Sequence, residues 1–283
     1  MQFSNIGIIG AGTMGIGMCI DLAFHGMSSV LVDISDDTLE SAKAEITKIV
    51  RFAPLLDKTL PKMDSDNVLN KIKFTTNIED VAECEFIVEN VTENWGIKET
   101  VYKQLSKICN AEACFAVNTS CISITKVGSV TERPDKVIGI HFMNPVYLKK
   151  SVEVIKGFHT SEETINTTQC FLKQLNKEAI IVNDLPGFVS NRISHLFMNE
   201  AAFVVQDGVA KPSQVDEIFK KCFNHKMGPL ETADLIGLDT VVNSLDILYE
   251  SYQDPKFRCC PLLRKMVDAK LLGKKSGKGF YTY

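Results

Sequence analysis

The feature that most constrains this chain is a glycine-rich turn near its start, set between two short apolar runs. Residues 6–9 are apolar and lead into Gly-Ala-Gly-Thr-Met-Gly at residues 10–15; a helix-like segment follows, and a second apolar run ends on Asp33. The order strand, glycine turn, helix, strand, acidic residue is typical of a dinucleotide-binding βαβ unit, whereas the six-residue motif alone would indicate only a flexible turn. The residues expected to contact a nucleotide here are Gly10, Gly12, Thr13, Met14, Gly15 and Asp33.

Each of these glycines has a physical role. Gly10 permits the tight turn, Gly12 lets the backbone approach a pyrophosphate, and Gly15 lets the helix pack against the strands. The helix N-terminus then offers unpaired N–H groups and a partial positive charge to the phosphates. Asp33 lies where a carboxylate accepts hydrogen bonds from the ribose hydroxyls, and no arginine occurs in residues 34–37 to bind a 2′-phosphate. The unit therefore favours NAD over NADP, although by itself it leaves a flavin open.

Composition restricts the class of protein. A chain of 283 residues is long enough for two domains and a sizeable core. The net charge of −4 gives no support for a nucleic-acid partner, and no apolar run reaches the length of a membrane span. Nine cysteines are scattered without a C-x-x-C pair, which indicates reduced thiols and no metal site. Because the first basic residue is Lys43, we expect no targeting signal and a cytoplasmic location.

Strand-like and helix-like segments alternate up to about residue 182, whereas residues 188–206, 212–223, 230–252 and 261–272 all have helical periodicity. This pattern predicts an α/β protein with an N-terminal, Rossmann-type, doubly wound parallel sheet over residues 1–185. A smaller all-α C-terminal domain over residues 186–283 follows. An all-helical domain of this size often completes its core against a second copy, so we expect a homodimer.

Polar residues with catalytic potential follow several predicted strands. Ser120 and His141 fall at the ends of strands, where a doubly wound sheet holds its ligand, and Glu153 lies on the next strand. Beside an NAD site, a histidine is a natural base for a hydroxyl proton, and a carboxylate orients its ring. Asn191 begins a helix and is placed to point toward the cleft between the domains. Structural roles remain open: His141 as a buried polar residue, Glu153 as a surface residue, and Ser120 as a helix cap.

Several motifs in fixed order identify a family. The chain resembles the NAD-dependent 3-hydroxyacyl-CoA dehydrogenases, and in length and layout especially the bacterial 3-hydroxybutyryl-CoA dehydrogenases. The resemblance covers nearly the whole chain. The matching motifs are GAGTMG at residues 10–15, NTS at 118–120, RPDKVIG at 133–139, HFMNPV at 141–146, VEVI at 152–155, PGFVSNR at 186–192, GPLE at 228–231, GLD at 237–239 and GKKSGKGFY at 273–281.

The resemblance implies roles for single residues. His141 would be the general base and Glu153 its partner, while Ser120 and Asn191 would position the hydroxyl and the thioester carbonyl of the substrate. The helical domain would dimerise, the acyl chain would bind between the domains, and the reaction would belong to fatty-acid or butanoate metabolism or to a specialised biosynthetic pathway. Residues matching family positions that line or contact the cofactor are Glu93, Lys98, Ser120, Asn144 and Lys275.

The chain also departs from the family pattern, at Asn90, Trp95, Cys121, Met143 and residues 147–151, which could reshape the acyl pocket. Residues 51–58 carry fewer cations than the corresponding segment of bacterial relatives, where lysines can meet the phosphates of CoA. An acyl group carried by an acyl carrier protein is therefore an alternative to acyl-CoA.

Two further functions are compatible with a chain of this layout. One is a dehydrogenase for β-hydroxy acids without a thioester, an enzyme class that usually places a catalytic lysine on a helix. The second is a non-enzymatic protein that kept the fold. The set Ser120, His141, Glu153 and Asn191 argues against the non-enzymatic function, because all four proposed catalytic groups are present.

Overall fold

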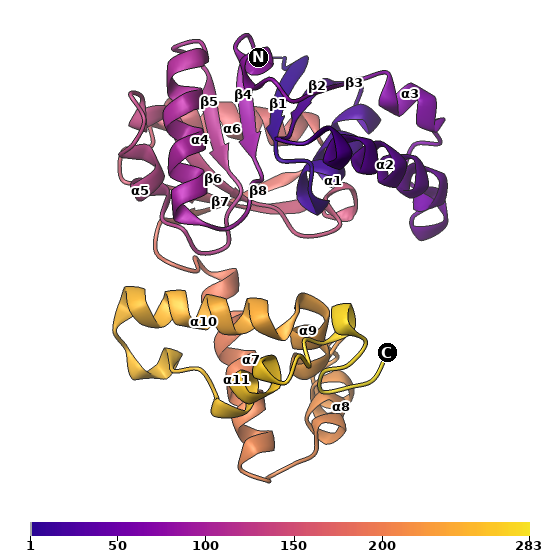
Figure 1. Ribbon diagram of the computed structural model, residues 1–283, viewed down its shortest axis with the longest axis vertical. Coiled ribbons are helices and arrows are strands. Elements are labelled where there is room, and N and C mark those ends of the chain that lie inside the picture. Colours follow the sequence, from indigo (N-terminus) through magenta and orange to yellow (C-terminus); the bar gives the residue numbers. More distant parts are fainter. Residues whose placement is uncertain (1) are drawn as a thin grey trace. The chain divides into compact units, whose positions relative to one another are not determined.

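A computed structural model describes residues 2–283, which form two compact units that divide between Asp184 and Leu185 (Figure 1). The first unit is a sheet covered by helices. Its strands are β1 Asn5–Ile9, β2 Ser28–Val32, β3 Ile72–Thr75, β4 Phe86–Glu89, β5 Cys114–Val117, β6 Val137–His141, β7 Ser151–Lys156 and β8 Glu178–Asn183. Its α-helices are α1 Thr13–Phe24, α2 Asp36–Leu56, α3 Ser65–Leu69, α4 Trp95–Ile108, α5 Ile124–Gly128 and α6 Glu162–Gln174.

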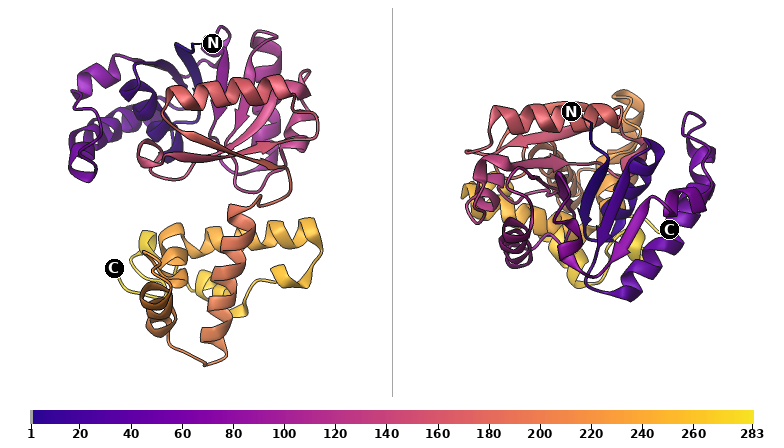
Figure 2. Two further views of the ribbon diagram at one scale, coloured as in Figure 1. Left: turned by 180° about the vertical axis from the view of Figure 1, so that it is seen from behind. Right: turned by 90° about the horizontal axis from the view of Figure 1, so that it is seen from above.

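The eight strands lie in the order β3-β2-β1-β4-β5-β6-β7-β8. Strands β1 to β3 are therefore added toward one edge of the sheet, and strands β4 to β8 toward the other. Side chains of β4 alternate between the two faces. Phe86 and Val88 point into the core shared with α1, α2 and α6, whereas Glu89 bonds to Lys98 of α4 on the other face. The left view of Figure 2 shows α6 lying across the sheet. This confirms the predicted Rossmann-type, doubly wound fold.

The predicted parallel sheet has one exception, because β7 runs antiparallel to β6. The segment between them, residues 142–150, contains only the 3₁₀ turn η3 Val146–Leu148. A parallel connection needs a crossover of a dozen or more residues, usually with a helix. The short connection therefore reverses the chain, and it pairs His141 directly with Glu153 across the two strands.

A proline and a glycine affect two of the helices differently. Helix α2 continues to Leu56 although Pro54 lies inside it, since a proline in the last turn removes a single backbone hydrogen bond. The helix predicted over residues 230–252 is two helices, because Gly237 adopts a φ of 105° between them. That conformation belongs to the region that favours glycine and ends the first helix.

The second unit is helical, as predicted. Its apolar core is formed by Met198, Leu230, Val241, Leu245 and Leu263 with their neighbours. The C-terminal tail is fastened to this core through Asp234, whose carboxylate accepts hydrogen bonds from the backbone N–H groups of Phe280 and Tyr281. Across residues 2–283, no helix combines the length and the apolar character needed to cross a membrane. The helices are α7 Ser190–Gln206, α8 Pro212–Cys222, α9 Pro229–Ile236, α10 Leu238–Tyr252 and α11 Pro261–Asp268.

Candidate functional site

A histidine and a carboxylate face each other across β6 and β7. His141 is the last residue of β6, and its Nδ1 lies 3.0 Å from Oε2 of Glu153, its register partner. Directly opposed residues of antiparallel strands share one face of the sheet, which is why a spacing of twelve residues brings them into contact. Both residues are buried, with exposed fractions of 6% and 8%. A carboxylate on Nδ1 keeps the proton there, so that Nε2 is left to act as a base.

Ser120 lies on the other side of this imidazole. Its Oγ is 3.5 Å from Nε2 of His141. The serine belongs to residues 118–121, which follow β5, and therefore comes from a different part of the sheet edge. The interpretation of Ser120 as the cap of the next helix is wrong, because α5 begins at Ile124 and Ser123 accepts the capping hydrogen bond from Lys126 N–H.

Residues 118–121 are held by a single carboxylate. Glu93 Oε1 accepts hydrogen bonds from Thr119 Oγ1 at 2.5 Å, Ser120 N at 2.9 Å and Cys121 N at 3.0 Å. Three donors converging on one oxygen make this segment a defined turn. The sequence indicated Glu93 only because it matches a family position that contacts the cofactor. Nothing in the sequence predicted its hydrogen bonds to the backbone N–H groups of Ser120 and Cys121.

Beneath this turn lies a fully buried ion pair. Lys98 and Glu89 both have an exposed fraction of 0%, and each Glu89 oxygen lies 2.8 Å from the Lys98 ammonium. Lys98 also donates to the carbonyl of Asn118 at 3.0 Å. Burial raises the pKa of Glu89, while the ammonium and the N–H group of Val91 act in the opposite direction. Glu89 was absent from the site predicted from the sequence.

The glycine turn has the shape expected of a nucleotide cradle. Gly10 has a φ of 97°, and a Cβ there would lie 2.8 Å from the carbonyl oxygen of Asn90. A Cβ at Gly15 would lie 1.9 Å from the carbonyl oxygen of Gly10, so only glycine lets α1 come this close to the turn. Around Gly12, by contrast, no atom lies within 4 Å of the Cβ position, which leaves open space at the N-terminus of α1. The backbone thus leaves room for a pyrophosphate where the amides of Thr13 and Met14 begin the helix.

The acidic residue after β2 lies beside this turn. Asp33 Oδ2 accepts a hydrogen bond from Ala11 N, and Oδ1 accepts one from Ile34 N, each at 2.8 Å. These contacts orient the carboxylate and leave lone pairs for ribose hydroxyls. The Ile34 side chain is 98% exposed, which is unusual for a large apolar residue and suits a flat partner such as adenine. The site predicted from the sequence did not include Ile34.

The remaining predicted site residues lie elsewhere. Asn144 is exposed in the segment after β6 and precedes a cis peptide bond to Pro145. Asn191 and Lys275 belong to the second unit. Asn191 lies in the first turn of α7, where its carbonyl accepts from Nδ1 of His195. Lys275 pairs with Asp239 at 2.6 Å. The structure thus brings together the side chains of Ser120, His141 and Glu153 with the Glu93–Lys98 network, all within the first unit.

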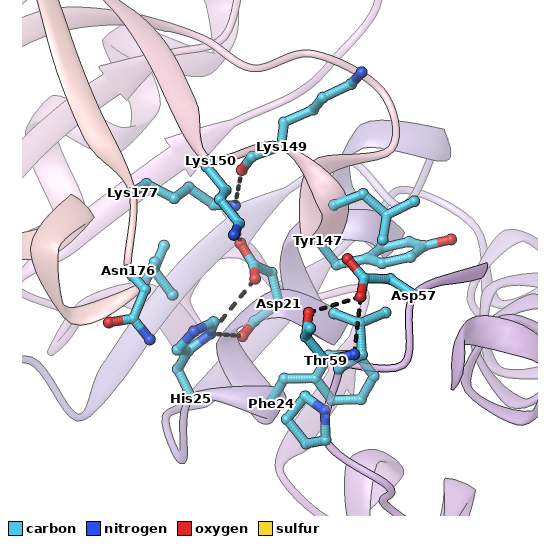
Figure 3. Close-up of a pocket in the computed structure, with 14 residues that line it drawn as sticks. Asp21, Phe24, His25, Asp57, Thr59, Tyr147, Lys149, Lys150, Asn176 and Lys177 are labelled. Atoms are coloured by element: carbon cyan, nitrogen blue, oxygen red, sulfur yellow. Dashed lines mark hydrogen bonds and ion pairs between the residues drawn. The ribbon is translucent and has the colours of Figure 1, made fainter. Parts of the chain in front are cut away.

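A separate cavity of about 320 Å³ lies between α1, the segment after α2, η3 and the turn that precedes β8 (Figure 3). Lys177 and His25 flank Asp21 at its base, and the Lys177 ammonium lies 2.9 Å from Asp21 Oδ2. Lys177 also donates hydrogen bonds to the carbonyls of Val146 at 2.8 Å and Lys149 at 2.6 Å, and its contact with Asp21 is an ion pair. None of the predicted catalytic residues lines this cavity.

Comparison with known families covers both units. Residues 5–185 match the model of the 3-hydroxyacyl-CoA dehydrogenase NAD binding domain, and residues 187–283 match that of the 3-hydroxyacyl-CoA dehydrogenase C-terminal domain. The first match shows that NAD is the cofactor. The open turn at Gly12, the oriented carboxylate of Asp33 and the N-terminus of α1 fit that group.

Individual relatives match over nearly their whole length. The chain is 42% identical to a probable 3-hydroxybutyryl-CoA dehydrogenase of Bacillus subtilis, covering 100% of this chain and 98% of the relative. It is 44% identical to a protein with the same description from Deinococcus radiodurans, covering 98% and 99%. Among solved structures, (S)-3-hydroxybutyryl-CoA dehydrogenase from Ralstonia eutropha is 40% identical and superposes with a TM-score of 0.93, covering 100% and 99% of the two chains.

Proposed function

The chain belongs to the 3-hydroxyacyl-CoA dehydrogenase family, and from this premise we propose that it interconverts a 3-hydroxyacyl thioester and its 3-oxoacyl thioester, with 3-hydroxybutyryl-CoA as the representative substrate. It is an NAD-dependent oxidoreductase. The observation that carries the proposed chemistry is the His141–Glu153 contact of 3.0 Å at the end of β6, with Ser120 at the opposite nitrogen.

In the proposed mechanism, Nε2 of His141 takes the proton from the substrate hydroxyl. NAD, when bound, would supply the nicotinamide that accepts a hydride from the carbon that carries this hydroxyl. The imidazole becomes positively charged as it takes the proton, and the neighbouring carboxylate of Glu153 stabilises that charge. Burial of both side chains strengthens their electrostatic interaction, because little water competes with it. In the reverse direction the imidazolium returns its proton to the alkoxide.

Ser120 and Asn191 position the substrate in this proposal. Ser120 Oγ lies 3.5 Å from the catalytic nitrogen, which places it to share a hydrogen bond with the substrate hydroxyl. Asn191 offers an amide N–H for the thioester carbonyl. Such a bond holds the thioester in place and polarises its carbonyl, which favours the 3-oxo product. Asn144 lines the nicotinamide side of the site, and Lys275 contacts the cofactor from the second unit.

We propose coenzyme A as the thioester carrier. The relatives are named as dehydrogenases of a CoA ester. Although residues 51–58 are poor in cations, the cavity beside Asp57 is also lined by Lys149 and Lys150, which supply positive charge next to that segment. Lysine is a suitable point charge for a phosphate. An acyl carrier protein would instead need a surface that recognises a folded partner.

A substrate panel tests this function. NADH formation would be measured with 3-hydroxybutyryl-CoA, with the same acyl group on an acyl carrier protein, and with free 3-hydroxybutyrate. We expect the highest kcat/KM with the CoA ester and little turnover of the free acid. Preference for the carrier-protein ester, or for the free acid, would establish that compound as the substrate instead. Sedimentation of the same preparation tests the proposed homodimer, and fractionation of source cells tests the cytoplasmic location.

A further inference from the structure

The ion pair of Glu89 and Lys98 makes contacts that its burial alone does not require. The ammonium of Lys98 has three hydrogens. They meet three acceptors: the two Glu89 oxygens at 2.8 Å and the carbonyl of Asn118 at 3.0 Å. With an exposed fraction of 0%, Lys98 makes all three contacts in the interior of the first unit. Its contacts lead to the turn that carries Ser120.

Charge connects this pair to the rest of the turn. The Lys98 ammonium lies 3.8 Å from Oε2 of Glu93, while Oε1 of Glu93 accepts the N–H groups of Ser120 and Cys121. Lys98 thus attracts one oxygen of Glu93 and leaves the other for the turn. Glu89 holds the lysine between the two carboxylates, and it is itself oriented by Val91 N at 2.6 Å. The turn is tied to this group at Asn118 O, Thr119 Oγ1, Ser120 N and Cys121 N.

We propose that Glu89 is a positioning residue for Ser120, acting through Lys98 and Glu93. In this assignment Lys98 links Glu89 to Glu93 and to the backbone carbonyl of Asn118. The proposal rests on the proposed function, in which Ser120 works beside His141. A contribution to stability alone would not explain the arrangement, since a buried ion pair is often no more stabilising than apolar residues of the same volume.

Removal of the Glu89 charge has a defined consequence. In Glu89→Gln, Lys98 loses its carboxylate partner and is left with Glu93 as the nearest acid. The ammonium then draws Glu93 away from the N–H groups of Ser120 and Cys121. We expect Ser120 to become mobile relative to His141, which slows the chemical step, whereas the glycine turn is untouched and NAD affinity stays the same.

The first test needs no substrate. Hydrogen exchange of the peptide spanning residues 118–122 would be followed by mass spectrometry in the apo protein. We expect at least tenfold faster exchange in Glu89→Gln than in the wild type. Glu99→Gln is the matched control, because Glu99 pairs with Lys103 on the same helix but at its exposed surface. Unchanged exchange in a folded Glu89→Gln protein would overturn the proposal, even if the enzyme proved to act on another substrate.

The second test is a double-mutant cycle with Ser120→Ala. We expect Glu89→Gln to lower kcat about tenfold with KM for NAD within twofold, and to have little further effect once Ser120 is alanine, because the two residues act through one interaction. Independent, additive losses would show that Glu89 acts elsewhere and would overturn the proposal.

A second variant covers the case in which Glu89→Gln fails to fold. Glu89→Gln/Lys98→Met removes both charges, so no unpaired ion remains in the interior. We expect this protein to be stable. Its turn loses the hydrogen bond from Lys98 to the Asn118 carbonyl, and Glu93 loses the ammonium that orients it, so exchange at residues 118–122 should stay fast and kcat low. Wild-type exchange and turnover in this folded variant would contradict the positioning role.

Discussion

Two histidine–carboxylate pairs occur in the first unit, and only one of them has the surroundings of a catalytic base. His25 and Asp21 are four residues apart in α1, with His25 Nδ1 2.8 Å from the Asp21 carbonyl and 3.4 Å from Oδ1. His141 and Glu153 are brought together across two strands, at 3.0 Å. The first pair needs only a helix, whereas the second needs the sheet.

The difference lies in what each partner does besides holding the imidazole. The carboxylate of Asp21 is shared with the buried ammonium of Lys177, so its charge is already balanced by a structural contact. Glu153, on β7, pairs with the last residue of β6, and the second nitrogen of that histidine lies near Ser120. A base therefore depends on position, not on the presence of a histidine next to an acid. Variants at each pair should separate their roles.

The largest effect is expected for His141→Ala. Loss of a general base lowers kcat by about 10² to 10⁴-fold. NADH affinity, measured by fluorescence titration, should stay within about twofold, because the glycine turn and Asp33 are unchanged. His25→Ala is the matched control and should keep wild-type turnover. A slow His25→Ala enzyme beside an active His141→Ala enzyme would reverse the assignment.

The next effect is on stability, for Asp21→Asn. This change leaves Lys177 buried without its carboxylate, and unpairing a buried ion costs about 3 kcal/mol or more. We expect urea denaturation to show that loss, while kcat of the folded fraction remains near that of the wild type. An unchanged unfolding midpoint would mean that the carbonyl contacts of Lys177 suffice without Asp21.

A smaller effect is expected for Glu153→Gln. The amide retains the size of the side chain and accepts a hydrogen bond from Nδ1, but it no longer stabilises the imidazolium. We expect kcat to fall about tenfold, which corresponds to about 1.4 kcal/mol in the transition state. Circular dichroism and the unfolding midpoint serve as checks on the fold. Wild-type turnover in this variant would assign Glu153 a structural role only.

The glycine turn and the His141–Glu153 pair differ in how much of their structure the sequence predicted. The glycine turn was predictable because its contacts are local: Gly10, Gly15 and Asp33 act through backbone geometry within a single βαβ unit. The spacing of His141 and Glu153 suggested a pair, but their contact depends on an antiparallel register that followed from the short connection and was not predicted.

The support beneath Ser120 was harder to predict. Glu89 lies on β4, Lys98 on α4, and Asn118 directly after β5. Their contacts depend on the face of β4 that Glu89 occupies and on the packing of α4 against that face. A lysine in an amphipathic helix usually signals the solvent side, and only the packing of α4 on the sheet shows that Lys98 is buried. Such non-local pairs leave no periodic pattern in a single sequence.

The smallest expected effect is a pH dependence of the unfolding free energy that comes from His25, the histidine of the pair in α1. The hydrogen bond to Asp21 raises the pKa of His25 above its ordinary value of 6.5. A group with a raised folded pKa stabilises the protein fully below its unfolded pKa and loses that contribution as the pH rises through the folded value. Because the imidazole is half-buried, we expect less than about 1 kcal/mol. The difference in unfolding free energy between the wild type and His25→Gln, from urea titrations, should therefore be largest below pH 6.5 and shrink in alkaline buffer. A difference that grows with pH would show that His25 is held in its neutral form and that Asp21 serves Lys177 alone.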